Sequence, residues 1–193
     1  MRQMQKNSRL IKCSVCGGVA LAAVILDQIT KLLVVKNFDN IGDSVDIIRN
    51  VLRFTYVTND GSAFGMLSDA RWVFMLFSTL GILAMAAYVI CFAKENSWFT
   101  TVSFGMVIGG GIGNMIDRLF NGETFGNGVV IDFIDFCAFP EIWKWVFNVA
   151  DSFVCVGVAL LIASFVADEV SRAKKHKSLA DGSDDGDDKD AEV

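Results

Sequence analysis

The chain carries four long apolar runs, separated by two long polar connections and one short one. The runs cover residues 11–35, 72–93, 98–116 and 146–167. Each is close to the roughly 20 residues that an α-helix needs to cross the apolar core of a bilayer. The pattern therefore predicts an all-α integral membrane protein with four transmembrane helices.

The first apolar run follows a basic segment, a combination that cleaved signal peptides also show. Residues 1–12 contain four basic side chains and no acidic one. Small residues at Ala20, Ala22 and Ala23 lie in the middle of the run, which continues well beyond them. We therefore expect an uncleaved spanning helix after a basic N-terminus.

The two long connections carry strand-like patterns. Apolar and polar side chains alternate in residues 51–57, which indicates a half-buried strand. A turn signal at Asn59-Asp60-Gly61 follows, and Ser62–Gly65 leads into the second run. A second strand-like segment covers residues 129–136. These segments predict a small β-sheet outside the membrane, beside the four helices.

The distribution of Lys and Arg indicates the orientation, since cytoplasmic flanks carry an excess of both. Basic residues lie in the N-terminal segment, at Lys94 in the short connection, and in residues 172–177. The long connections also contain basic residues, but they are longer, and the first of them carries acids as well. We therefore place both termini in the cytoplasm and the long connections outside.

This topology brings acidic residues from several segments to one level. Asp27 lies ~21 Å beyond Cys13 along the first helix, and Asp151 lies ~7.5 Å past Val146, at the rise of an α-helix. The acids expected near the outer leaflet are Asp27, Asp117, Asp132, Asp135 and Asp151. A carboxylate inside an apolar span is costly, so such a group indicates a functional site.

Composition supports a membrane protein, because 53% of the residues are hydrophobic. The net charge of −5 arises in an acidic C-terminal tail. Residues 168–193 are predicted to form a cytoplasmic tail, first basic and then acidic and disordered, without a catalytic role.

Cys13 and Cys16 form a lone CxxC, which we interpret as apolar packing residues. Nothing in the composition indicates nucleic-acid binding.

The residue types restrict the possible chemistry. The single histidine, His176, lies in the basic C-terminal flank, which argues against a Ser-His-Asp arrangement and a zinc site. Ser/Lys catalysis stays possible through Ser62 or Ser152. However, Lys31 has Asp27 one helical turn away, and this spacing favours an ion pair.

Two aspartates that share a proton are the most economical catalytic group. The ionised one would take a proton from water while the protonated one polarises a carbonyl group. Asp151 is one member, and either Asp132 or Asp135 is the other, because their spacing on a strand does not decide between them. The other polar candidates are Asp27, Lys31, Asn59, Asn114, Asp117, Arg118 and Asn148.

Other interpretations stay open at this point. Asp27 with Lys31 is also explained as an ion pair that orients the first helix, and Asn114 with Arg118 as a cap on the third. A small transporter would also contain intramembrane acids, although at several depths. A head-group transferase that binds a metal through Asp132 and Asp135 is the other alternative.

Five motifs in order resemble those of the lipoprotein signal peptidases (signal peptidase II), which are bacterial membrane aspartic peptidases. The motifs are Asp27-Gln-Ile-Thr-Lys31, Asn59-Asp-Gly-Ser-Ala-Phe64, Gly113-Asn-Met-Ile-Asp-Arg118, Val130-Ile-Asp-Phe133 and Phe147-Asn-Val-Ala-Asp-Ser152. The resemblance covers residues ~10–167, nearly the whole chain apart from its tails. It departs in residues 121–128, a connection that looks longer than is usual.

The resemblance implies that Asp132 and Asp151 are the catalytic pair. Further residues that it implies in substrate binding or support are Asp27, Lys31, Asn59, Gly61, Asn114, Arg118 and Asn148. It implies a peptidase domain over residues 13–167, without metal or cofactor, that acts as a monomer. The implied substrates are diacylglyceryl-modified prolipoproteins, cut just before the lipidated cysteine, in the bacterial cytoplasmic (inner) membrane and near its outer leaflet.

Overall fold

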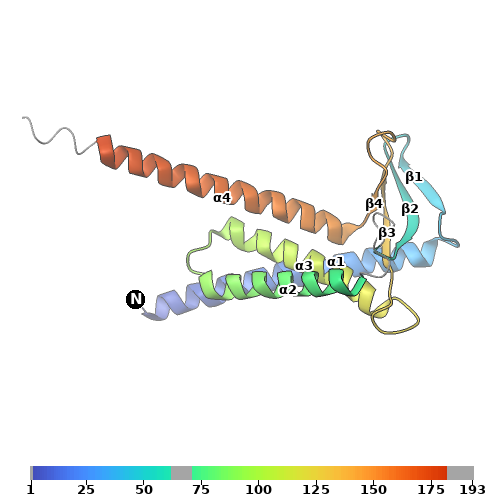
Figure 1. The fold of residues 1–193 in the computed structure, drawn as a ribbon, viewed down its shortest axis with the longest axis horizontal. Helices are drawn as coiled ribbons and strands as arrows, with labels where there is room; N and C mark the ends of the chain where they lie inside the picture. The colour runs from blue at the N-terminus through green and yellow to red at the C-terminus, as the bar shows by residue number, and fades with distance from the viewer. Residues whose placement is uncertain (1, 62–70, 182–193) are drawn as a thin grey trace, which may run out of the picture.

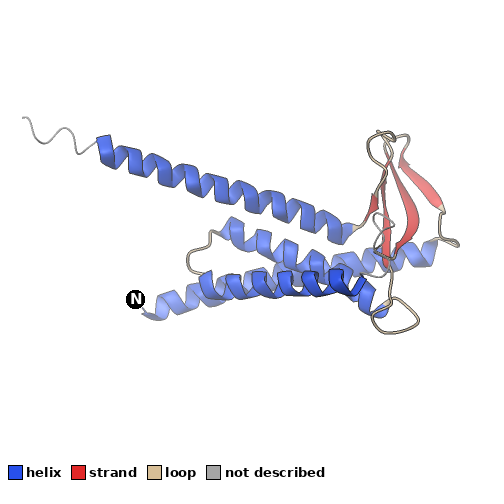
Figure 2. Ribbon diagram, viewed as in Figure 1, coloured by secondary structure: helices blue, strands red, loops and turns tan. Residues whose placement is uncertain are grey.

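The computed structural model describes residues 2–61 and 71–181, which form a bundle of long helices with a sheet at one end (Figure 1). The helices are α1 (Arg2–Asn37), α2 (Arg71–Phe92), α3 (Trp98–Phe120) and α4 (Val149–Asp181). The strands are β1 (Ser44–Ile48), β2 (Leu52–Asn59), β3 (Val130–Phe136) and β4 (Val146–Phe147). Figure 2 shows how clearly the two kinds of element are separated in space.

The four predicted spans are confirmed within the described residues. The stretches that are long and apolar enough to cross a membrane are Asn7–Asn37, Trp72–Phe92, Trp98–Phe120 and Val149–Lys174. Many large apolar side chains on α1, α2 and α4 are exposed at the surface of the bundle. Such exposure is expected where lipid, and not water, surrounds the helices.

Helix α3 lies at the centre of the bundle and packs against the other three helices. Glycines allow its close approach to α1. A Cβ atom at Gly109 would lie 2.5 Å from the carbonyl oxygen of Ala20, and one at Gly105 would lie 2.7 Å from that of Cys16. Small residues at such contacts let two helix backbones approach closely inside a membrane. The glycine-rich third run is thus a buried helix and not a loop.

The sheet is antiparallel, with the order β1-β2-β3-β4, and stands across one end of the bundle (Figure 1). The predicted strands correspond to β2 and β3, whereas β1 and β4 were not identified from the sequence. We call the end of the bundle that carries the sheet the sheet end. The opposite end, with the turn between α2 and α3 at residues 93–97, is the far end.

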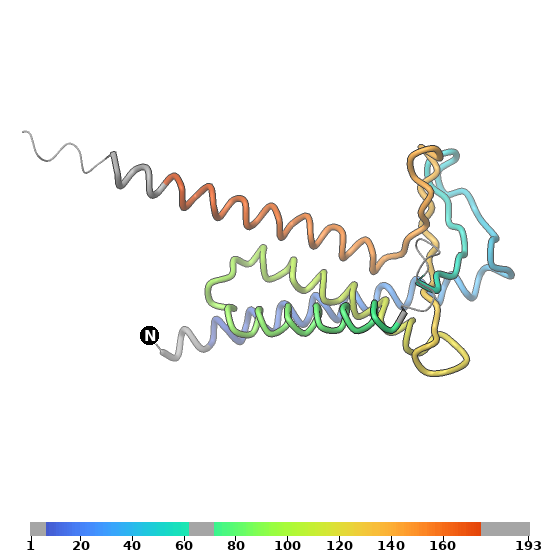
Figure 3. Tube along the Cα trace, in the orientation of Figure 1, coloured from blue at the N-terminus to red at the C-terminus, as the bar shows by residue number. Residues whose placement is uncertain are grey.

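Three helices differ from their predicted limits by more than two residues, and α3 is one of them, because it continues past Ile116 to Phe120. Helix α4 begins at Val149 and not at Val146, because Val146 and Phe147 pair with β3 as strand β4. Helix α1 extends back to Arg2, and α4 continues past Ala167 to Asp181, so the basic flanks expected outside the spans are helical. Figure 3 shows α4 diverging from the other helices towards the far end. The predicted segment Ser62–Gly65 and the acidic residues 182–193 lie outside the described residues.

Candidate active site

The first turn of α4 is fixed by a reciprocal pair of hydrogen bonds. The backbone N–H of Asp151 donates to Asn148 Oδ1 over 2.9 Å, and the backbone N–H of Asn148 donates to Asp151 Oδ2 over 3.2 Å. This is the arrangement of a capping box, in which two side chains satisfy the free donors of a helix N-terminus. Asp151 therefore has a defined orientation at the point where β4 ends and α4 begins.

Asn148 also binds the second carboxylate of the site. Its Nδ2 atom donates to Asp132 Oδ1 over 2.7 Å, so Asn148 binds the Asp132 carboxylate through its side chain and the Asp151 carboxylate through its backbone N–H. Two other amides complete the pair. Asn59 Nδ2 donates to Asp132 Oδ2 over 3.1 Å, and Asn114 Nδ2 donates to Asp151 Oδ1 over 2.7 Å. Each carboxylate thus accepts hydrogen bonds from neutral donors.

The environment of Asp132 favours its neutral form. The side chain is buried, with only 3% of its surface exposed. Burial raises the pKa of Asp132 from 3.8 to about 6; the negative charge of Asp151 adds to this rise, and the hydrogen bonds from Asn59 and Asn148 oppose it. A carboxyl group with this pKa can carry a proton close to neutral pH.

A buried group of three charges lies directly behind the pair. Lys31 Nζ lies 2.8 Å from Asp27 Oδ2 and 2.8 Å from Asp117 Oδ2, and all three side chains are at most 5% exposed. The same amine donates to Asn114 Oδ1 over 2.9 Å. A buried carboxylate needs such a partner, since an isolated charge is very costly there.

Each acid of this group holds a segment that carries one member of the pair. Asp27 Oδ1 accepts the backbone N–H of Ala150, next to Asp151, over 2.9 Å. Asp117 Oδ2 accepts the backbone N–H of Ile131, next to Asp132, over 3.3 Å. One lysine therefore links the positions of β3 and α4.

Asp135 lies in a different environment from Asp132, although both are on β3. Its Oδ2 atom accepts hydrogen bonds from Arg53 Nε at 2.6 Å and from Thr55 Oγ1 at 3.0 Å. The Asp135 carboxylate raises the pKa of Arg53, which is partly exposed. Thus Asp132, and not Asp135, shares Asn148 with Asp151, whereas Asp135 binds Arg53 and Thr55.

Two further predicted residues lie beside the pair. Arg118 Nη1 donates to the carbonyl oxygen of Asn114 over 3.1 Å, and its guanidinium lies 4.8 Å from the ring centre of Phe74. Gly61 has a φ of +93°, which a residue with a side chain rarely adopts. Its N–H donates to Asn59 Oδ1 over 2.9 Å and so orients the amide that binds Asp132. Ser62, a possible nucleophile, lies outside the described residues.

A groove of about 310 Å³ runs from Asp151 into the membrane-spanning part of the bundle, between α2, α3 and α4. Asp151, Asn114 and Arg118 line its polar end. Ser78, Ile82 and Met85 are among the residues deeper in the groove. The groove therefore offers an extended, mostly apolar segment access to one carboxylate of the pair.

Sequence reasoning missed the contribution of two residues. Gln28 Nε2 donates to Asp117 Oδ1 over 2.9 Å and to the carbonyl oxygen of Gly113 over 3.2 Å, joining α1 to α3. A glutamine beside Asp27 in an apolar run was the available signal. Asp117 was a candidate from its position, but the family resemblance did not assign it a role.

Within residues 2–61 and 71–181, no cluster of three or more His, Cys, Asp or Glu side chains could hold a metal.

The chain is similar to known proteins over most of its length. Residues 19–167 match the family model described as signal peptidase (SPase) II. A protein of Halalkalibacterium halodurans named lipoprotein signal peptidase is 39% identical over 160 residues, which cover 83% of this chain and 96% of that protein. A protein of the same name from Halothermothrix orenii is 40% identical over 144 residues, covering 75% and 90%.

Solved structures of similar fold are bacterial membrane enzymes determined by the in meso method. Two of them are 33% identical to this chain and cover 78% of it, with TM-scores of 0.67 and 0.68. The matched part is 87% of the first structure and 91% of the second. The likeness therefore extends over the four helices and the sheet together.

Proposed function

Because this chain belongs to the signal peptidase II family and is a multi-pass bacterial membrane peptidase, we propose that it processes diacylglyceryl-modified prolipoproteins. It cuts the peptide bond just before the lipidated cysteine, and Asp132 and Asp151 activate the attacking water. The observation that carries this proposal is that Asn148 donates hydrogen bonds to both carboxylates, from its side chain to Asp132 and from its backbone N–H to Asp151.

The raised pKa of Asp132 supports one division of roles within the pair. Asp132 holds the shared proton and donates a hydrogen bond to the carbonyl oxygen of the scissile bond. Asp151, ionised, takes a proton from water as the water oxygen attacks the carbonyl carbon. The carbon–nitrogen bond then breaks, and the proton on Asp151 passes to the leaving nitrogen. The products are the carboxyl end of the signal peptide and the free amino group of the cysteine.

The neutral amides around the pair support this division of roles. Asn59, Asn114 and Asn148 donate hydrogen bonds without adding a positive charge, so one carboxyl group can stay protonated. A lysine or arginine in direct contact would favour the ionised form of both. The cation Lys31 instead binds Asp27 and Asp117 behind the pair.

The position of the pair also suits a lipid-anchored substrate. The acyl chains of such a substrate stay in the outer leaflet, so its scissile bond lies near the membrane surface. The distribution of Lys and Arg favours cytoplasmic termini in the inner membrane, which places the sheet end outside. The groove beside Asp151 would accept the signal peptide. We propose that the protein acts as a monomer and needs no cofactor.

The decisive experiment compares a lipidated and an unlipidated precursor as substrates of the purified protein. We expect cleavage of the lipidated precursor, with a new amino terminus at the modified cysteine, and little cleavage of the other. Equal rates on both precursors would contradict the assignment. Activity should also be the same with and without a strong chelator, whereas loss of activity on chelation would favour a metal-dependent reaction.

A further inference from the structure

The loop between β3 and β4 carries large apolar side chains that no part of the described chain covers. Phe139, Ile142, Trp143 and Trp145 are 59%, 76%, 40% and 53% exposed. We call these four residues the aromatic tip. Exposed apolar groups of this size, gathered on one loop, mark a surface that contacts another apolar phase.

The aromatic tip is an ordered structure. The backbone N–H of Trp143 donates to the carbonyl oxygen of Phe139 over 2.8 Å, and its indole Nε1 donates to that of Trp145 over 2.8 Å. The rings of Trp143 and Trp145 meet edge to face, with centroids 5.5 Å apart. The tip is also tied to the β1–β2 turn, because the N–H of Cys137 donates to the carbonyl oxygen of Val51. Its exposed rings are therefore held in place by the fold.

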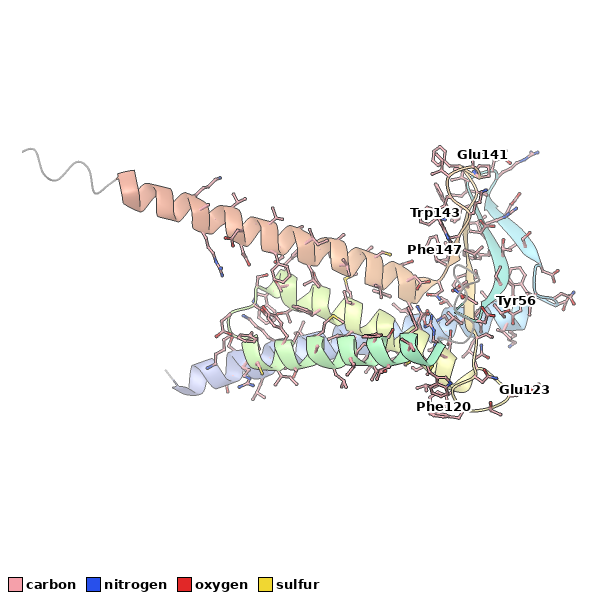
Figure 4. The ribbon with its side chains drawn as sticks, viewed as in Figure 1. Tyr56, Phe120, Glu123, Glu141, Trp143 and Phe147 are labelled. Carbon is pink, nitrogen blue, oxygen red and sulfur yellow. The ribbon has the colours of Figure 1, made fainter. Side chains whose placement is uncertain are left out.

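The tip lies at the level where the helices enter the membrane. Figure 4 shows Trp143 and Phe147 on the side of the sheet that faces α4, near its first turn. Phe147 lies two residues before Val149, where the fourth span begins, and its ring is 6.0 Å from that of Trp143. Trp72, which is 60% exposed, begins the span of α2 at the same end of the bundle. The lipid-facing surface of the helices thus continues onto the tip.

We propose that the aromatic tip inserts into the interfacial layer of the bilayer at the sheet end and anchors the sheet beside the bundle. Tryptophan favours this layer, because its ring is apolar and its N–H is polar. Lys144, exposed between the two tryptophans, can extend its ammonium group towards lipid phosphates. The partner is therefore the lipid surface, and the contact lies laterally outside the four helices (Figure 1).

This contact would set the position of the catalytic strand. Phe147 is paired with Ile134 on β3, two residues from Asp132. Anchoring the tip therefore restrains the tilt of β3 relative to the membrane, and with it the height of Asp132 above the lipid. The inference goes beyond the proposed function, since lipid contact can be measured without any cleavage.

The test uses the fluorescence of Trp143 and Trp145 in the full chain. Trp72→Phe and Trp98→Phe together leave these two as the only tryptophans. In vesicles of phosphatidylcholine and phosphatidylglycerol, lipids brominated near the headgroup should remove most of their emission, and lipids brominated at the chain ends much less. Strong quenching by aqueous acrylamide instead would place the tip in water. Resistance to both quenchers would indicate a contact with protein, such as a second copy. Either outcome would overturn the proposal.

A matched pair of substitutions tests the consequence. Ile142→Ser removes an apolar side chain from the tip, and Ile47→Ser removes the same side chain from β1, where it is 50% exposed. In Figure 1, β1 is the strand farthest from the helices. We expect Ile142→Ser to weaken quenching by the headgroup-brominated lipid and Ile47→Ser to leave it unchanged. Equal effects of the two substitutions would show that the tip has no special contact with lipid.

Discussion

The two ends of the helix bundle are held together by different kinds of contact. At the sheet end, charged and amide side chains from α1, α3, α4 and the sheet bind one another, and many of them are buried: Asp27, Lys31, Asp117, Asp132 and Asn148. Towards the far end, α1 and α3 meet through Gly105 and Gly109, beside an apolar cluster that includes Phe104 and Leu161. Polar contacts there include a short chain of hydroxyl groups, from Ser97 through Thr100 to Ser164, with a 2.6 Å hydrogen bond between Thr100 and Ser164.

This difference shows that the chain holds its helices together in one region and fixes the positions of particular side chains in another. Apolar packing fills volume and tolerates small rearrangements, so it can hold helices together without fixing particular atoms. Hydrogen bonds and ion pairs require one defined partner for each donor and acceptor. The carboxylates of Asp132 and Asp151 therefore lie where the packing is most specific. We expect the sheet end to be sensitive to charge and the far end to volume.

The largest effect should follow replacement of either member of the pair. Asp132→Asn and Asp151→Asn keep the shape of the side chain but remove the titrating group. Since general acid–base catalysis contributes about 10²–10⁴-fold, each should lower kcat by roughly 10³-fold. The measurement is cleavage of a lipidated precursor by purified variants whose folding is checked by thermal unfolding.

Asp135→Asn is the matched control, because it makes the same change three residues away on β3. Its carboxylate pairs with a partly exposed arginine, a contact of about 1 kcal/mol or less. We expect cleavage within a few-fold of the parent. If Asp135→Asn lost activity while Asp132→Asn kept it, the assignment of the pair would be wrong.

The next largest effect concerns the charged group behind the pair. Lys31→Met leaves Asp27 and Asp117 buried without their cation, which costs about 3–5 kcal/mol when a buried ion pair is broken. The variant should unfold at a clearly lower temperature in detergent. Lys36→Met, at an exposed position near the end of the same helix, is the control and should match the parent. Equal stability of both variants would mean that the charges do not hold the sheet end together.

Much of this arrangement could be predicted from local sequence. Each apolar run identified a helix, the alternation in residues 51–57 identified β2, and the strand-like segment 129–136 identified β3. The topology also predicted that acids from separate segments meet, and Asp27 and Asp117 do bind one lysine. These features depend on periodicity and length, which a single sequence contains.

Other features depend on partners far away in the chain. In the structure, Asp135 differs from Asp132 through its contact with Arg53, which lies 82 positions away and binds it across the sheet. The start of α4 was placed too early, because Val146 and Phe147 are as apolar as a helix requires and only their pairing with β3 makes them a strand. Hydropathy cannot distinguish these states in so short a segment.

A smaller effect, on stability alone, should follow a change of volume away from the sheet end. In Gly109→Ala, the new Cβ atom would lie 2.5 Å from the carbonyl oxygen of Ala20, so α1 and α3 must move apart. Overpacking of this kind costs about 1–3 kcal/mol. Gly18→Ala, where a Cβ atom meets nothing within 4 Å, is the control and should be neutral. Both should be measured by thermal unfolding, and a kcat per folded molecule that fell with Gly109→Ala would show that the two ends are coupled.

The smallest expected effect is a shift of the pH profile, and it tests the role of Asp132 directly. Its pKa of about 6 lies above the ordinary value of 3.8, so the folded protein binds an extra proton between these values. The stabilisation from that proton is complete below pH 3.8 and is lost as the pH rises through about 6. If the protonated form is active, kcat/KM of the free enzyme should fall over the same upper range.

Removing the hydrogen bond from Asn59 to Asp132 should shift the fall of kcat/KM to higher pH. Asn59 donates to the Asp132 carboxylate and so lowers its pKa. In Asn59→Ala the pKa rises, and kcat/KM should fall at a higher pH than in the parent. Thr55→Ala removes the equivalent hydrogen bond on β2 to Asp135 and should leave the profile unchanged. A fall that moved to lower pH with Asn59→Ala, or moved equally with Thr55→Ala, would mean that the titrating group is not Asp132.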